Sequence, residues 1–179
     1  MEHAGVSVGP IHGRRGKTHL KKRLAGYNFA AVHAPWLVLM DLDSEEDCAP
    51  LLKQSLLPRP SEFMCLRIAV REVEAWLLAD RESIATFLGV SRDLVPLSVE
   101  AIEDPKGTIV NLAKRSRWRA IQEDLVPAEA GGRQVGSAYT SRLGEFVAGK
   151  WRPDVAAGRC ESLARTLVCI GRLIESAPG

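Results

Sequence analysis

The sequence lacks the long apolar run of a membrane helix and the cysteine spacing of a zinc site. No stretch of its 179 residues approaches the roughly 18 apolar residues of a membrane span, and no apolar segment follows the basic N-terminus as in a secretory signal. We therefore expect a cytoplasmic protein with no membrane partner. There is no C-x-x-C pair and no H-x-x-x-H pair, so zinc is not indicated. We expect reduced cysteines at all four positions, which are Cys48, Cys65, Cys160 and Cys169.

A strong overall charge is also lacking. The formal net charge is +2, and the hydrophobic fraction of 46% with 26% charged residues is that of an ordinary globular protein. The length fits one domain over residues 1–179, with a strand-containing part at about 1–90 and a helical part at about 91–179. Charge is instead local, because basic residues crowd 14–23 and acidic residues crowd 41–47.

Two apolar runs predict the strands. Residues 35–40, PWLVLM, form a continuous run ending at Asp41, which is typical of a strand buried on both faces in a parallel sheet. A second run at 64–70 leads into an apolar stripe of helical period that extends to Leu88, and Gly89 is placed to end that helix.

The second half of the chain predicts helices. Asp104 and Pro105 are an N-cap and a first helical residue for a helix that runs to about Lys114. A loop rich in glycine follows at 126–136, and further helices are expected near 138–148 and 160–176. The fold class is therefore α/β, with a small, mostly parallel sheet flanked by helices and a helical C-terminal half.

Asp41 and Asp43 form the sharpest chemical feature. Alternate side chains of an extended segment point the same way, so both carboxylates can reach one cation at the end of the strand. Magnesium prefers such oxygen ligands and takes only one or two carboxylates from a protein. The sequence thus predicts a magnesium site with catalytic Asp41 and Asp43. The alternative is that the acids of 43–47 only begin a helix, where acids are favoured.

Glu74 follows the second strand and is the predicted third acid of the catalytic and metal site. Nearby Arg71 and Lys106 are expected to bind phosphate and to offset negative charge. The alternative for Glu74 is a first-turn carboxylate that only interacts with the helix dipole.

The basic segment near the N-terminus, with Arg14, Arg15 and Lys17, is a further candidate for phosphate or nucleic-acid binding. Residues 13–18 end in Gly-Lys-Thr, but the first glycine of a phosphate loop falls at Ile11, so a basic turn before a helix is the better interpretation. A phosphotransferase that uses this turn ranks last. The Asp41-x-Asp43 pair is also similar to that of haloacid-dehalogenase phosphatases, whose usual threonine is replaced here by Glu45.

Several segments together carry a family resemblance. They are WLVLMDLD followed by Cys-Ala-Pro at 48–50, RIAVREVEAWLLAD, DPKGTIVNLAKRS, the spaced Gly136, Tyr139 and Trp151, and SLAR at 162–165. They resemble the domain of unknown function family four-two-seven-six, a bacterial group allied to the Toprim superfamily. The resemblance implies a Toprim-like fold and a magnesium-dependent nuclease acting on nucleic acid, of the kind found beside ATPases in phage-defence loci.

One departure from the Toprim pattern keeps a second function open. Toprim domains begin with a strand that ends in glutamate, typically within E-G-x-x-D, and this sequence contains no such stretch. Either the start of the sequence has been assigned too late, or the protein has lost the first strand together with its acid. The alternative function is a catalytically inactive Toprim-like module that binds nucleic acid or an ATPase partner.

Overall fold

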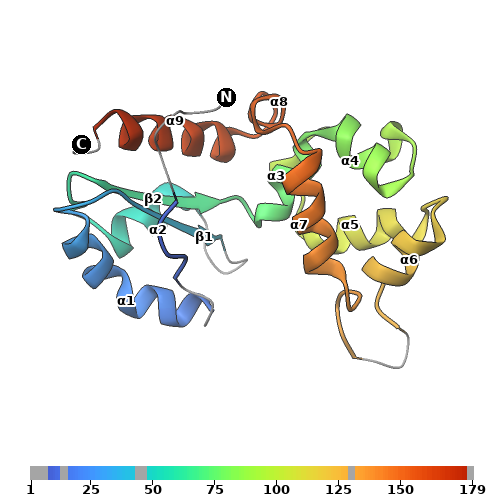
Figure 1. Ribbon diagram of the computed structural model, residues 1–179, viewed down its shortest axis with the longest axis horizontal. Helices are drawn as coiled ribbons and strands as arrows, with labels where there is room; N and C mark the ends of the chain where they lie inside the picture. Colours follow the sequence, from blue (N-terminus) through green and yellow to red (C-terminus); the bar gives the residue numbers. More distant parts are fainter. Residues whose placement is uncertain (1–7, 13–15, 43–47, 129–131, 177–179) are drawn as a thin grey trace. The chain divides into compact units, whose positions relative to one another are not determined.

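The chain is a mixed α/β protein that is mostly helical, seen in a computed structural model that describes residues 8–12, 16–42, 48–128 and 132–176 (Figure 1). It forms two compact units. Unit 1 comprises 1–40, 46–68 and 166–179, and unit 2 comprises 41–45 and 69–165. Both strands lie within residues 36–69, inside the predicted strand-containing part. The single domain stays a prediction.

Two parallel strands, β1 (Trp36–Asp41) and β2 (Met64–Ala69), belong to unit 1 except for their last residues, Asp41 and Ala69, which belong to unit 2. Trp36 donates its backbone N–H to the carbonyl of Phe63, and Leu42, just past β1, donates to Ala69, each at 2.9 Å. Donor and acceptor are separated by the same number of residues in both bonds, as expected for parallel strands. The sequence predicted both strands from their continuous apolar runs; β2 is mostly buried, whereas Leu37 of β1 is exposed, so burial of β1 on both faces is only partial.

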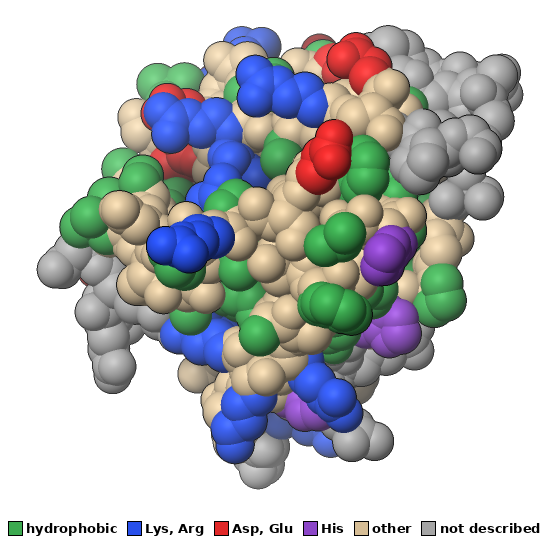
Figure 2. All heavy atoms as spheres, turned by 90° about the vertical axis from the view of Figure 1, so that its left-hand side faces the viewer, with side chains coloured by type: hydrophobic (Ala, Val, Ile, Leu, Met, Phe, Trp, Pro, Cys, Tyr) green, Lys and Arg blue, Asp and Glu red, His purple; other side chains and the backbone are tan. Residues whose placement is uncertain are grey.

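Helices cover the strands of unit 1 on two sides. In Figure 1, α1 (Lys17–Ala30) lies below the strands, the C-terminal part of α9 (Glu161–Glu175) lies above them, and α2 (Ala49–Leu56) connects β1 to β2. Val38 and Leu66 are among the buried strand residues. Figure 2 shows that Lys and Arg side chains are scattered among apolar ones over the described part of this face, without one continuous basic field.

The cysteines correct one prediction. Cys65 of β2 and Cys169 of α9 form a disulfide with their Cα atoms 6.1 Å apart, so the expectation of four reduced cysteines is wrong for this pair. Cys48 and Cys160 are free. The paired residues are 104 positions apart, and only the packing of α9 on the sheet brings them together.

Unit 2 begins with two helices where the sequence predicted one. α3 (Val73–Ala79) and α4 (Arg81–Leu88) are separated at Asp80, whose backbone is not helical and whose carboxylate accepts a hydrogen bond from the N–H of Ser83. The apolar stripe runs through both α3 and α4, but the Asp80 side chain caps α4 and thereby starts a new helix. Gly89 ends α4 in the left-handed conformation, as predicted.

The remaining helices of unit 2 match the sequence in part. α5 (Pro105–Lys114) has the predicted Asp104 cap, and α7 (Tyr139–Gly149) lies where it was expected, as does α9, of which only residues 161–165 belong to unit 2. Two short helices were missed, α6 (Arg119–Leu125) and α8 (Pro153–Ala157), together with two single 3₁₀ turns at Arg92–Leu94 and Val99–Ala101. Segments this short carry too few residues for a periodic pattern. No helix among the described residues is long and apolar enough to cross a membrane.

Candidate acidic site of unit 2

Asp41 is attached to the start of the helix that carries Glu74. Its Oδ1 accepts a hydrogen bond of 3.1 Å from the backbone N–H of Val73, the first residue of α3. The first N–H groups of a helix have no acceptor within the helix, and their partial positive charge favours an anion. The end of β1 and the start of α3 are thereby joined through one carboxylate.

Glu74 is a buried acid, and its carboxylate has neighbours of both charge signs. Its exposed fraction is only 7%, its Oε1 accepts a hydrogen bond of 3.3 Å from the hydroxyl of Tyr139, and the Lys106 ammonium lies 3.7 Å away. Burial raises the pKa of Glu74, Lys106 lowers it, and the charges of Glu72 and Asp41 raise it again, so that the net direction is upward. Glu74 therefore lies close enough to Asp41 for the two charges to interact.

Lys106 supplies the positive charge of this cluster from the first turn of α5. Its Nζ lies 3.0 Å from Oε1 of Glu72, and its backbone N–H donates to the other oxygen of the same carboxylate at 2.9 Å. Burial lowers the pKa of Lys106, but the hydrogen bond to Glu72 and the charges of Glu74 and Asp41 outweigh it and raise the pKa. Lys106 thus remains a cation at neutral pH.

Tyr139 closes the cluster from α7. It is buried, and burial followed by the charge of Glu74 raises the pKa of its phenol. It therefore stays protonated and donates to Glu74 rather than titrating. We call Asp41, Glu72, Glu74, Lys106 and Tyr139 the acidic site; all five belong to unit 2.

The structure brings together three of the predicted site residues, Asp41, Glu74 and Lys106. Arg71 is half-exposed and makes no ion pair with these acids within the described part of the chain. The predicted Asp43, Arg14 and Arg15 lie outside the described residues. Lys17 is the half-buried first residue of α1 in unit 1.

Sequence reasoning missed two members of the site. Glu72 precedes Glu74 by two positions, and the E-x-E spacing was a signal that could have been used. Tyr139 entered only through the family resemblance, since nothing local to it indicates that α7 presents it to Glu74. Such a contact between residues 65 positions apart depends on helix packing.

The carboxylates of the acidic site are hard oxygen donors, the kind of ligand that suits magnesium, calcium or manganese. Asp41 and Glu74 offer only carboxylate oxygens, and a magnesium ion takes one or two of these while keeping several waters. Among the described residues, no group of three or more His, Cys, Asp and Glu side chains could hold a metal. The site thus offers the carboxylates of Asp41 and Glu74, with the ammonium of Lys106 3.7 Å from Glu74.

Comparisons with known proteins leave the family open. A scan against family models, a search of curated proteins and a search of solved structures each find no match to this chain. The site must accordingly be interpreted from its own chemistry.

Proposed function

We propose that the protein is a Toprim-like, magnesium-dependent nuclease whose active site is the acidic site of unit 2. The observation that carries this proposal is Glu74, a buried carboxylate with a raised pKa beside the charge of Asp41. A fold gains little stability from such an arrangement, and perturbed acids of this kind are concentrated at functional sites. The family resemblance supplies the nucleic-acid substrate and the bacterial phage-defence setting, and the cytoplasmic location is the one predicted from the sequence.

The residues have distinct roles in this proposal. Asp41 and Glu74 hold the magnesium ion, and Asp43 joins them as the sequence predicts. When bound, the ion polarises a phosphate and lowers the pKa of water. Lys106 balances the negative charge that develops on phosphate, and Tyr139 orients Glu74 through its hydroxyl.

A cleavage assay tests the proposal. Labelled DNA and RNA oligonucleotides are incubated with the protein in magnesium or in chelator, and with the variants Asp41→Asn and Glu74→Gln. Asparagine keeps an oxygen that can accept from Val73, so Asp41→Asn removes charge without removing the helix contact. We expect magnesium-dependent cleavage by the native protein and its loss in both variants.

Asp154→Asn is the matched control, because Asp154 is an exposed acid in the first turn of α8. Cleavage that persists in both site variants, or that is lost equally in the control, would remove the basis of the proposal.

The alternative is a catalytically inactive Toprim-like module that binds nucleic acid or an ATPase partner. The ion pairs of Lys106 favour it, since an ammonium 3.0 Å from Glu72 and 3.7 Å from Glu74 already balances these acids without a metal ion. This alternative predicts nucleic-acid or ATPase binding in chelator and no cleavage in magnesium.

A further inference from the structure

The junction between α5 and α6 carries an unusual concentration of positive charge. We call residues 114–119, of sequence Lys-Arg-Ser-Arg-Trp-Arg, the basic turn. All of its side chains are exposed except that of Ser116, which is buried. Ser116 accepts a hydrogen bond from the N–H of Trp118 at 2.9 Å, and its carbonyl accepts from the side chain of Gln122 at 2.6 Å. The cations are therefore displayed on a turn of fixed conformation.

Trp118 is held at the surface within this turn. Its exposed fraction is 47%, and its ring lies so close to Gly89 that a β carbon at position 89 would overlap it. The N–H of Arg117 donates to the carbonyl of Gly89 at 3.1 Å, and the Arg117 guanidinium lies 4.6 Å from the centre of the Trp118 ring. A half-exposed indole and a guanidinium thus form one preorganised stack.

Helix stability does not account for all of these cations. Lys114 and Arg115 end α5, where positive charge is favoured, but Arg117 and Arg119 lie at the start of α6, where the helix dipole favours acids. Arg119 is balanced in part by Glu123 at 2.7 Å. The turn retains an excess of positive charge that an external polyanion would match.

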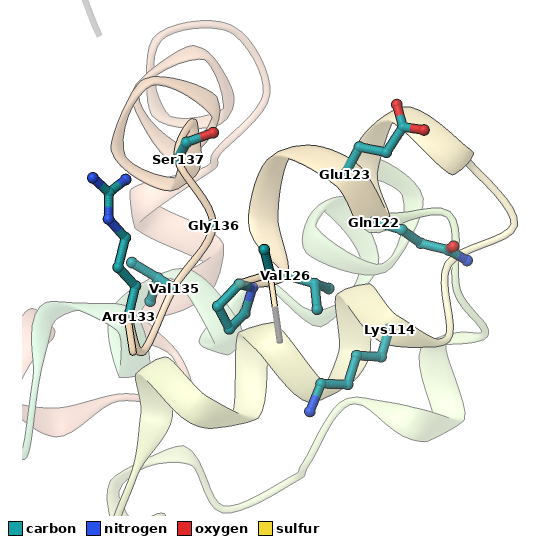
Figure 3. A pocket seen from close by; sticks show the side chains of 10 residues that line it. Lys114, Gln122, Glu123, Val126, Arg133, Val135, Gly136 and Ser137 are labelled. Atoms are coloured by element: carbon teal, nitrogen blue, oxygen red, sulfur yellow. The ribbon is translucent and has the colours of Figure 1, made fainter. Parts of the chain in front are cut away.

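A cavity of about 810 Å³ adjoins the basic turn, within the usual size range of ligand sites. Figure 3 shows Lys114 and Arg133 on two separate segments, with Val126 and Val135 between them. The lining thus combines apolar side chains with two cations and with one acid, Glu123, whose charge is paired with Arg119. It is continuous with the turn, because Lys114 belongs to both and because Gln122, which lines the cavity, bonds Ser116.

We infer that the basic turn and this cavity bind single-stranded nucleic acid. Arg117 and Trp118 stack on a base, the other cations contact phosphates, and the cavity takes an unstacked nucleotide between Lys114 and Arg133. A single strand is the occupant, because an aromatic surface can stack only on bases that are not paired and stacked in a duplex. The inference rests on the proposed function in that it names the form of its substrate.

Fluorescence anisotropy with labelled oligonucleotides, in chelator so that no cleavage occurs, tests the inference. The native protein is expected to bind a single strand more tightly than the matching duplex. The double variant Arg115→Gln/Arg117→Gln should weaken binding about tenfold or more. The slope of the logarithm of the binding constant against the logarithm of the salt concentration should become shallower by about 0.7 for each phosphate contact removed. Trp118→Leu should weaken binding by a similar factor, through the loss of base stacking.

Arg159→Gln/Arg165→Gln is the matched control, because both arginines are exposed residues of unit 2 and the variant loses the same charge. It is expected to bind as the native protein does. Circular dichroism melts verify folding, and the glutamine variants keep the test decisive if Trp118→Leu fails to fold. Equal weakening in the control, unchanged binding by the turn variant, or duplex binding as tight as that of the single strand would overturn the inference.

The failures of the two proposals are distinguishable. If the basic turn is needed for single-strand binding but magnesium produces no cleavage, the nuclease proposal is contradicted and the inference is supported. If single strands are cleaved and the KM is the same in the turn variant, the inference is contradicted and the nuclease proposal is supported.

Discussion

Unit 2 contains two buried carboxylates on or next to the same helix, and their surroundings differ. Asp80, at the end of α3, is fully buried; it accepts from the N–H of Ser83 at 3.3 Å and from Arg152 at 3.0 Å, 2.9 Å and 2.6 Å. Glu74, in the first turn of α3, accepts from the hydroxyl of Tyr139 at 3.3 Å and from its own backbone N–H, and an ammonium lies 3.7 Å away.

The two pKa values move in opposite directions. Burial raises the pKa of Asp80, but the hydrogen bonds of Arg152 and Ser83 outweigh it and lower the pKa overall. For Glu74 burial prevails, and the pKa rises. Burial alone thus does not identify a functional acid. The number and strength of the hydrogen-bond donors explain the difference: the charge of Asp80 is stabilised by several donors, whereas burial disfavours the charged form of Glu74, as is common for acids of functional sites.

Removal of the Asp80 carboxylate should have the largest effect on stability. Asp80→Ala leaves the cap of α4 and three donors of Arg152 without their acceptor, and we expect a loss of about 3 kcal/mol in the free energy of unfolding. Urea unfolding measures this change. The exposed control Asp154→Ala should stay within about 0.5 kcal/mol of the native protein. A loss of that small size for Asp80→Ala would mean that the two buried acids do not differ as proposed.

Glu74→Gln should show the reverse pattern. Because the buried charge lacks strong donors, its removal should change stability by less than about 1 kcal/mol. Magnesium-dependent cleavage should fall by about a hundredfold or more. Parallel unfolding and cleavage measurements on one preparation provide the comparison. A variant that unfolds easily yet cleaves normally would place Glu74 among the structural acids.

The sequence predicted the parts of the molecule that depend on local pattern. Both strands follow from apolar runs, α5 follows from Asp104 and Pro105, and the end of α4 follows from Gly89. The break at Asp80 was missed, since the apolar stripe continues across it and only the contact with Arg152 gives that acid its position.

The candidate site was predictable to the same extent. Asp41 is the last residue of β1 and Glu74 follows β2, and a parallel sheet places such residues at one edge. Tyr139 and the pairing of Lys106 with Glu72 depend on how α5 and α7 pack, which no local pattern encodes. The same reason explains why the disulfide of Cys65 and Cys169 was missed.

Tyr139→Phe is a smaller test of the environment of Glu74. The variant removes one hydroxyl donor and keeps the ring, so we expect a loss of about 1 kcal/mol in the free energy of unfolding. Chemical unfolding of the variant gives the value. Tyr27→Phe is the control, because Tyr27 belongs to unit 1 and makes ring contacts with His12 and Trp36 that phenylalanine can retain. Equal losses in both variants would show that the hydroxyl contact with Glu74 has no particular role.

The pH dependence of stability should show the smallest effect, and it concerns Asp80. Its folded pKa lies below the unfolded value of 3.8, so its stabilising contribution is complete above pH 3.8 and is lost as the pH falls through the folded pKa. Unfolding measured from neutral to acid pH in the native protein and in Asp80→Asn should therefore give curves that converge at low pH. Curves that stay parallel throughout would contradict the lowered pKa.

Calorimetric titration with magnesium tests the central claim, that Asp41 and Glu74 jointly hold a cation. The account predicts saturable heat for the native protein at millimolar magnesium or below, and binding at least about tenfold weaker in Asp41→Asn. An identical isotherm in the variant, or no saturable heat in the native protein, would contradict it.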